Sequence, residues 1–184
     1  MLAILMMFPS ITFAEHDLYA DVKNSAYEMA EVIVNDHGVS GLQYALVSDG
    51  NIVVSGTAGI FHKSNVIPLN SQAMFGIGSI SKMFTTTAIM LLSDQGKLDL
   101  DEPVVTYLPE FKMADERYKK ITVRMLLNHS SGIMGSVYVN GATYDYPNTL
   151  NHDALLAQLA TQKLKADPGE FSVYCNDGFT LAEL

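Results

Sequence analysis

The stretch that decides the fold is residues 75–84, FGIGSISKMF, in which Ser79 and Lys82 stand three positions apart. From Ser79 onward, apolar residues recur at helical spacing until Gly96, which is placed to end the helix. Because residues i and i+3 share a helix face, the Lys82 amine is expected to reach the Ser79 hydroxyl. A serine hydroxyl becomes a good nucleophile when a neighbouring base takes its proton. The pair therefore predicts a nucleophile and its proton acceptor.

This motif is weak when it is taken alone. A chance Ser-x-x-Lys is expected about once in a chain of this composition, and the alternative is a serine at a helix start beside a solvated lysine. The position does suit the chemistry, because the N–H groups and the positive dipole end of a helix start favour developing negative charge. Gly76 and Gly78 would let backbone and substrate approach Ser79 closely.

The composition is that of a globular protein and argues against several classes of function. The 184 residues are 48% hydrophobic and 17% charged, enough for one domain with a substantial core. The net charge of −9 repels phosphate backbones, so no nucleic-acid partner is expected. The five histidines and the single cysteine, Cys175, show no metal-ligand spacing. We expect no metal, no organic cofactor and no disulfide within the chain.

Residues 1–14 have the features of a secretory signal. They carry no charge and contain an apolar run from Leu2 to Phe8, followed by a candidate cleavage site after Ala14. The run is too short to span a bilayer, so we expect a periplasmic or secreted protein without a membrane span. No basic residue precedes the run, which leaves a buried apolar N-terminus as the alternative.

The other patterns predict a mixture of helices and a hairpin. An amphipathic helix is expected at residues 16–37, ending at Gly38, followed by a hairpin whose turn is residues 48–51. Residues 61–72 are polar, contain Pro68 and are expected to form a loop. Shorter helices are expected before Leu108-Pro109, at 122–128 with Thr122 as the cap, at 153–161 and from 177 onward.

Together these pieces resemble the serine β-lactamase and penicillin-binding-protein superfamily, in the branch that holds class C β-lactamases, D-alanyl-D-alanine carboxypeptidases and related esterases. The nucleophile motif is residues 75–84, and a Tyr-x-Asn motif is formed by Tyr174, Cys175 and Asn176. The remaining stretches that carry the resemblance are residues 96–104 with 107–111, 121–133, and 168–171, which lead into 174–179.

The resemblance implies an α/β (α+β) fold of the β-lactamase type. The N-terminal helix and the hairpin would belong to the central antiparallel sheet, and the later helices to the helical domain. No third motif of the Lys-Thr-Gly or His-x-Gly kind follows, and the later strands of the sheet are missing. We therefore expect residues 15–184 to be a serine hydrolase domain truncated at its C-terminus, an N-terminal fragment that is inactive by itself.

The resemblance also implies the roles of the site residues. Ser79 would attack the carbonyl carbon of a β-lactam, a D-amino-acid peptide or a small ester, and water would release the acyl-enzyme. Lys82 and Tyr174 would share the proton transfers, and which of them is the main base stays open. Asn176 would orient Lys82 and bind the substrate, and the Ser79 backbone N–H would serve as an oxyanion donor. The expected partner is a small-molecule or peptide acyl substrate, and the sequence does not indicate an oligomeric state.

Several alternatives were weighed against this interpretation. Tyr-x-Asn also occurs at 138–140 and 146–148, but only the copy at Tyr174 has a Pro-Gly turn before it and a helix start after it. Cys175 is expected to alternate away from the site as a small buried side chain. His129 would permit a Ser-His-Asp triad, although the chain has no Gly-x-Ser-x-Gly elbow.

Two other functions remain open at this point. One is a penicillin-binding or sensor-like descendant that binds or acylates without turnover. The other is an unrelated exported structural domain that carries the motifs by chance.

Overall fold

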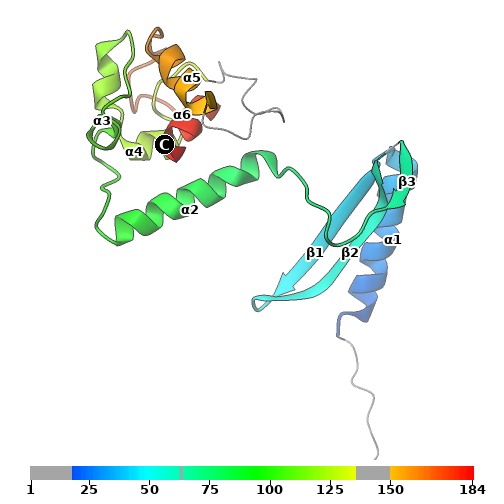
Figure 1. Ribbon diagram of the computed structural model, residues 1–184. Helices are drawn as coiled ribbons and strands as arrows, with labels where there is room; N and C mark the ends of the chain where they lie inside the picture. Colours follow the sequence, from blue (N-terminus) through cyan, green and yellow to red (C-terminus); the bar gives the residue numbers. More distant parts are fainter. Residues whose placement is uncertain (1–17, 63, 136–149) are drawn as a thin grey trace, which may run out of the picture. The chain divides into compact units, whose positions relative to one another are not determined.

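A computed structural model describes residues 18–62, 64–135 and 150–184 of the chain (Figure 1). The chain divides into two compact units, Met1–Gly76 and Ile77–Leu184, and each is described by itself. Among the residues described, no helix has both the length and the apolar character needed to cross a bilayer.

Three features predicted from the sequence lie outside the described residues. They are the signal segment 1–14 and the Tyr-x-Asn copies at 138–140 and 146–148. The signal segment therefore remains a prediction, as does the domain boundary at residue 15.

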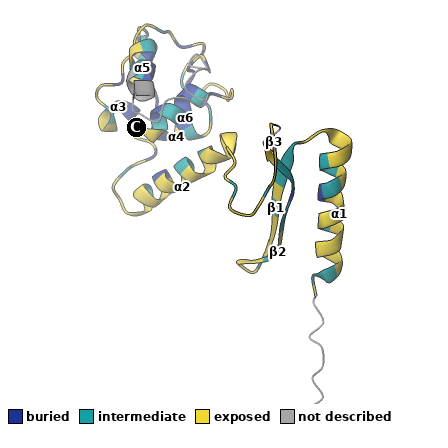
Figure 2. Cartoon of the chain, turned by 45° about the vertical axis from the view of Figure 1, so that its right-hand side comes forward, coloured by how far each residue is buried: buried dark blue, intermediate teal, exposed yellow. Residues whose placement is uncertain are grey.

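The first unit is a helix against an antiparallel sheet. The helix α1 (Ala20–His37) ends at Gly38, whose φ of +67° is the left-handed conformation predicted for it. Ala30 of α1 is buried, and Figure 2 shows the more buried positions of α1 on the side that faces the sheet. Met29, which belongs to the predicted apolar face, is 60% exposed.

The sheet has the order β1-β2-β3, with β1 (Gly41–Ser48), β2 (Asn51–His62) and β3 (Asn65–Pro68). The predicted hairpin is confirmed, with Ser48 paired to Asn51 across its turn. The prediction that 61–72 is a loop was wrong. Residues Asn65–Pro68 pair with the far end of β2, in a strand of four residues that is too short to show a period of two.

The second unit is helical. Its longest helix is α2, preceded by a single 3-10 turn, η1 (Gly78–Ile80), and ended by Gly96 at φ +66°. The core contains the almost fully buried side chains of Phe111, Ile121 and Leu126. The sequence did not predict η2 or the start of α5 at Leu150. The elements are α2 (Ser81–Asp94), α3 (Val104–Tyr107), η2 (Glu116–Lys120), α4 (Val123–Leu127), α5 (Leu150–Leu159) and α6 (Asn176–Glu183).

Backbone hydrogen bonds join the chain after α4 to the segment that leads into α6. The N–H of Lys165 donates to the carbonyl of Gly132 (2.9 Å), and the N–H of Gly169 donates to the carbonyl of Ser130 (2.8 Å). Gly132 has φ +77°, and a Cβ there would lie 2.5 Å from the carbonyl oxygen of Ala166. Only glycine fits this crossing, which brings the Tyr-x-Asn segment beside the end of α4.

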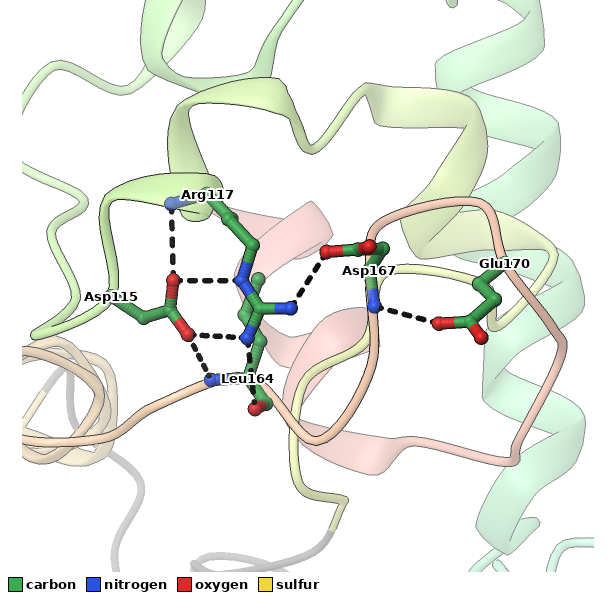
Figure 3. Close-up of polar contacts among 5 residues, drawn as sticks. All are labelled: Asp115, Arg117, Leu164, Asp167 and Glu170. Carbon is green, nitrogen blue, oxygen red and sulfur yellow. Dashed lines mark hydrogen bonds and ion pairs between the residues drawn. The ribbon is translucent and has the colours of Figure 1, made fainter.

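Arg117 also binds the segment that leads into α6, through Leu164 and Asp167 (Figure 3). The guanidinium of Arg117 in η2 donates two hydrogen bonds to the Asp115 carboxylate (3.0 and 2.6 Å) and one to Asp167 (2.6 Å). The carboxylate of Asp115 also accepts from the Leu164 N–H (3.2 Å). Hydrogen bonding to Arg117 holds the pKa of Asp115 well below its usual range.

Replacing Arg117 with alanine is expected to lower the thermal unfolding midpoint by a few degrees, because it leaves the two carboxylates of Asp115 and Asp167 without their shared partner. Lys119→Ala in the same turn is the matched control, since its ion pair with Glu116 lies at the exposed surface and is expected to contribute little. Differential scanning calorimetry of the full-length protein checks this. Equal midpoints for the two variants would contradict the role given to Arg117.

Candidate active site

The site begins with the turn that precedes α2. Gly78 adopts φ +52° and starts η1, so Ser79 lies in a 3-10 turn just before α2 and not inside the α-helix. Lys82 lies one helical turn further on, and its Nζ donates a hydrogen bond to Ser79 Oγ at 3.2 Å. The local spacing of the two residues therefore brings their side chains together, as the sequence predicted.

The Tyr-x-Asn segment completes the cluster from far along the chain. The phenol oxygen of Tyr174 lies 2.5 Å from Ser79 Oγ, although the two residues are 95 positions apart. Lys82 Nζ also donates to Oδ1 of Asn176, the first residue of α6, at 2.7 Å. All four side chains proposed from the sequence thus meet in one place, around the Ser79 hydroxyl.

The electrostatics of the cluster favour an acidic phenol. Hydrogen bonding with Lys82, and next with Ser79, lowers the pKa of Tyr174 from its usual value. Lys82 Nζ lies 5.0 Å from the centre of the Tyr174 ring and 5.5 Å from that of Phe179, a cation–π arrangement. The amine therefore stabilises negative charge on the phenol and is itself stabilised as a cation by two rings.

His129 lies at this site but does not form the triad considered for it. Its Nδ1 accepts a hydrogen bond from the backbone N–H of Cys175 at 3.1 Å, whereas a triad histidine donates from that atom to a carboxylate. Burial, and then the charge of Lys82, lower the pKa of His129. Its ring lies 4.6 Å from the Tyr174 ring and 5.1 Å from the Phe179 ring, between centres. Phe179 belongs to the helix start that follows the Tyr-x-Asn motif, but its ring contact with His129 was not predicted from the sequence.

Cys175 is a structural residue. It is 1% exposed, and its sulfur accepts a hydrogen bond from the Gly178 N–H at 3.2 Å as the N-cap of α6. Burial raises the pKa of its thiol. The prediction of a small buried side chain is confirmed. Its backbone is extended at the N-cap of α6 (φ −139°, ψ 110°), and its side chain is buried while those of the neighbouring Tyr174 and Asn176 reach the cluster.

Two other kinds of site were considered in the second unit. No three His, Cys, Asp or Glu side chains gather as metal ligands anywhere in the described part of the chain. An apolar pocket of about 480 Å³ lies among α2, α3, α4 and α6, with Ile89, Leu126 and Leu181 in its wall. Its lining includes neither Ser79 nor Lys82, so the chemistry of the cluster lies outside this pocket.

Known proteins resemble this chain in both sequence and fold. The family model described as Beta-lactamase matches residues 26–184. The chain belongs to the beta-lactamase family. Its fold agrees with that membership, since the superfamily resemblance and the mixed helix and antiparallel-sheet architecture predicted from the sequence are both confirmed.

Individual members of the beta-lactamase family resemble the chain at moderate identity. Penicillin-binding protein 4 of Amycolatopsis lactamdurans is 34% identical over 109 residues, which are 59% of this chain and 28% of that protein. The D-amino acid amidase of Ochrobactrum anthropi SV3, solved with L-phenylalanine, is 26% identical to this chain and superimposes on it with a TM-score of 0.69. The match covers 89% of this chain and 45% of the amidase.

A solved class C beta-lactamase has a TM-score of 0.71 at 24% identity, over 92% of this chain and 45% of the enzyme, and shows the shared fold alone. The chain thus spans less than half of each of these three relatives. The activity of the whole protein to which this chain belongs is therefore proposed below.

Proposed function

We propose that Ser79 is the nucleophile of a serine hydrolase that acts through an acyl-enzyme. The observation that carries this proposal is the meeting at one hydroxyl of two polar groups from distant segments, Tyr174 OH at 2.5 Å and Lys82 Nζ at 3.2 Å. A nucleophile within hydrogen-bond reach of its base, with a third group orienting that base, is the arrangement that activates a serine.

Tyr174 is the proposed acceptor of the serine proton. As Ser79 Oγ forms its bond to the acyl carbon, the proton passes to the Tyr174 phenolate and then to the leaving group. The phenol is the nearer of the two candidate bases, and its pKa is already lowered. Lys82 acts as a hydrogen-bond donor in this proposal, because it donates to both Ser79 Oγ and Asn176 Oδ1 and lies over two aromatic rings.

The remaining roles concern the substrate. The backbone N–H of Ser79, at the start of η1, is the proposed oxyanion donor on this segment. Asn176 fixes the Lys82 amine through its Oδ1 and is also the proposed binding residue for the substrate. Water then hydrolyses the acyl-enzyme and restores the Ser79 hydroxyl.

The proposed substrate is a β-lactam, a D-amino-acid peptide or amide, or a small ester. The support comes from the relatives, which include a penicillin-binding protein, a class C beta-lactamase and a D-amino acid amidase. The apolar, uncharged residues 1–14 favour export, so we propose a periplasmic or secreted location.

Covalent labelling of the full-length protein tests the proposal. Treatment with a fluorophosphonate or a fluorescent penicillin is expected to add one acyl or phosphonyl group, read as a mass increase of the intact protein. A chromogenic ester or cephalosporin should then be turned over. Adduct formation without turnover would favour the descendant that acylates without hydrolysis, and no adduct with any of the probes would contradict the proposal.

A further inference from the structure

We propose that His129 is a positioning residue for the Tyr174 phenol. It contacts the ring of Tyr174 and the backbone of the residues immediately before and after it. The inference rests on the proposed function, in which Tyr174 takes the serine proton. The geometry that carries it is a set of three contacts between one histidine and three consecutive residues of the Tyr-x-Asn segment.

Two of the contacts are hydrogen bonds to the backbone. The carbonyl of His129 accepts from the N–H of Val173 at 2.9 Å, and its Nδ1 accepts from the N–H of Cys175 at 3.1 Å. The residue between these two amides is Tyr174. His129 therefore fixes the chain immediately before and immediately after the tyrosine.

The third contact is made by the rings. The His129 and Tyr174 rings lie 4.6 Å apart between centres, with an angle of 42° between their planes. Tyr174 lies in an irregular stretch before α6 and is 52% exposed, so secondary structure and burial alone leave its side chain freedom to choose another rotamer. The imidazole limits that freedom and keeps the phenol against Ser79 Oγ.

The backbone of His129 ends helix α4. Its φ of +63° is the left-handed conformation common just after a helix, where the His129 N–H donates to the Leu126 carbonyl (3.3 Å) and the Ser130 N–H donates to the Met125 carbonyl (2.9 Å). This helix end places the carbonyl and the ring of His129 where both contact the Tyr174 segment.

The charge state of the ring follows from the same contacts. Because Nδ1 accepts from a backbone N–H, the imidazole is neutral with its proton on Nε2. The titratable groups facing it are the Lys82 amine from α2 and the Tyr174 phenol from the segment before α6, whereas Cys175 contacts the ring through its backbone N–H. Burial and the Lys82 charge both lower the pKa of His129, which maintains the neutral form.

Two variants of the full-length protein separate the side-chain acceptor of His129 from its backbone conformation. His129→Gly tolerates the left-handed φ but has no side-chain acceptor. His129→Asn also tolerates it and places an amide oxygen where Nδ1 stands. We expect His129→Gly to lower kcat for a chromogenic ester about 10- to 100-fold with little change in KM, because the base is misplaced. His129→Asn should recover most of that loss.

A second measurement does not depend on turnover. Ultraviolet difference titration against Tyr174→Phe isolates the Tyr174 phenol, whose pKa should rise toward that of an ordinary tyrosine in His129→Gly and stay low in His129→Asn. An unchanged kcat and phenol pKa in His129→Gly would overturn the inference, as would an equal loss in the two variants. If the wild type forms no acyl-enzyme, the proposed function fails, and the titration still decides the role of His129.

Folding of each variant is checked by its cooperative unfolding transition. If His129→Gly does not fold, the inference is tested by comparing kcat and the phenol pKa of His129→Asn with those of the wild type. A phenol pKa and kcat close to wild type would support the inference. A loss of kcat as large as that of Tyr174→Phe, in a variant that folds, would overturn it.

Discussion

Ser79→Ala in the full-length protein is expected to abolish acylation. The hydroxyl is the atom that bonds to the acyl carbon, and the neighbouring groups, Lys82 and Tyr174, have no function in acylation without it. Loss of the nucleophile in a serine hydrolase costs on the order of 10⁶-fold in kcat. Intact mass after treatment with a fluorophosphonate or a penicillin should show no adduct, and turnover of a chromogenic ester should fall by about that factor.

Ser81→Ala is the matched control for this result. Ser81 is the first residue of α2, two positions after Ser79, and it is exposed. The variant removes the same oxygen atom from the same helix start, and it should keep both the adduct and the turnover. Labelling that survives Ser79→Ala, or that disappears only in Ser81→Ala, would contradict the assignment of the nucleophile.

Tyr174→Phe is expected to lower the rate of acylation about 10²- to 10⁴-fold, the usual contribution of a positioned general base. The ring and its packing against His129 and Phe179 remain, so the variant should fold and bind substrate as before. Stopped-flow measurement of acylation by a chromogenic substrate gives the rate constant directly. A rate close to wild type would assign the proton transfer to Lys82 instead.

The pH dependence of acylation gives a second test of the same residue. The active form of Tyr174 is the phenolate, so the rate should rise with pH as the phenol loses its proton and level off above its pKa. Hydrogen bonding with Lys82 is the main cause that lowers this pKa. Lys82→Met removes that donor while keeping an unbranched side chain, so it should move the rising limb to higher pH. A rising limb that stays in place in Lys82→Met and persists in Tyr174→Phe would contradict the proposed base.

The elements that could be predicted from the sequence are those with local signals. Helix α1 ends at Gly38, the hairpin turns at 48–51, and α4 begins after its cap Thr122, whose side chain accepts from the Met125 N–H. Each of these signals lies within a few residues of the structure it causes. The strand β3 has no such signal, because it forms by hydrogen bonding to the far end of β2.

The 3-10 helix η2, like β3, has no local sequence signal. This turn is stabilised by contacts of Arg117 with Asp167 and Leu164, residues about fifty positions away. The charge pattern of the stretch gave no indication of those partners. It was therefore missing from the predicted elements.

The sequence by itself determined the pairing of Ser79 with Lys82, because one helical turn brings positions i and i+3 together whatever surrounds them. It also determined the family, through motifs that each have a local pattern. The sequence context also favoured Tyr174, but only the tertiary structure brings its phenol to Ser79 Oγ and places His129 against its ring. Those contacts join residues 95 and about 45 positions apart, and the crossing of Gly132 with Ala166, not any local preference, brings them together.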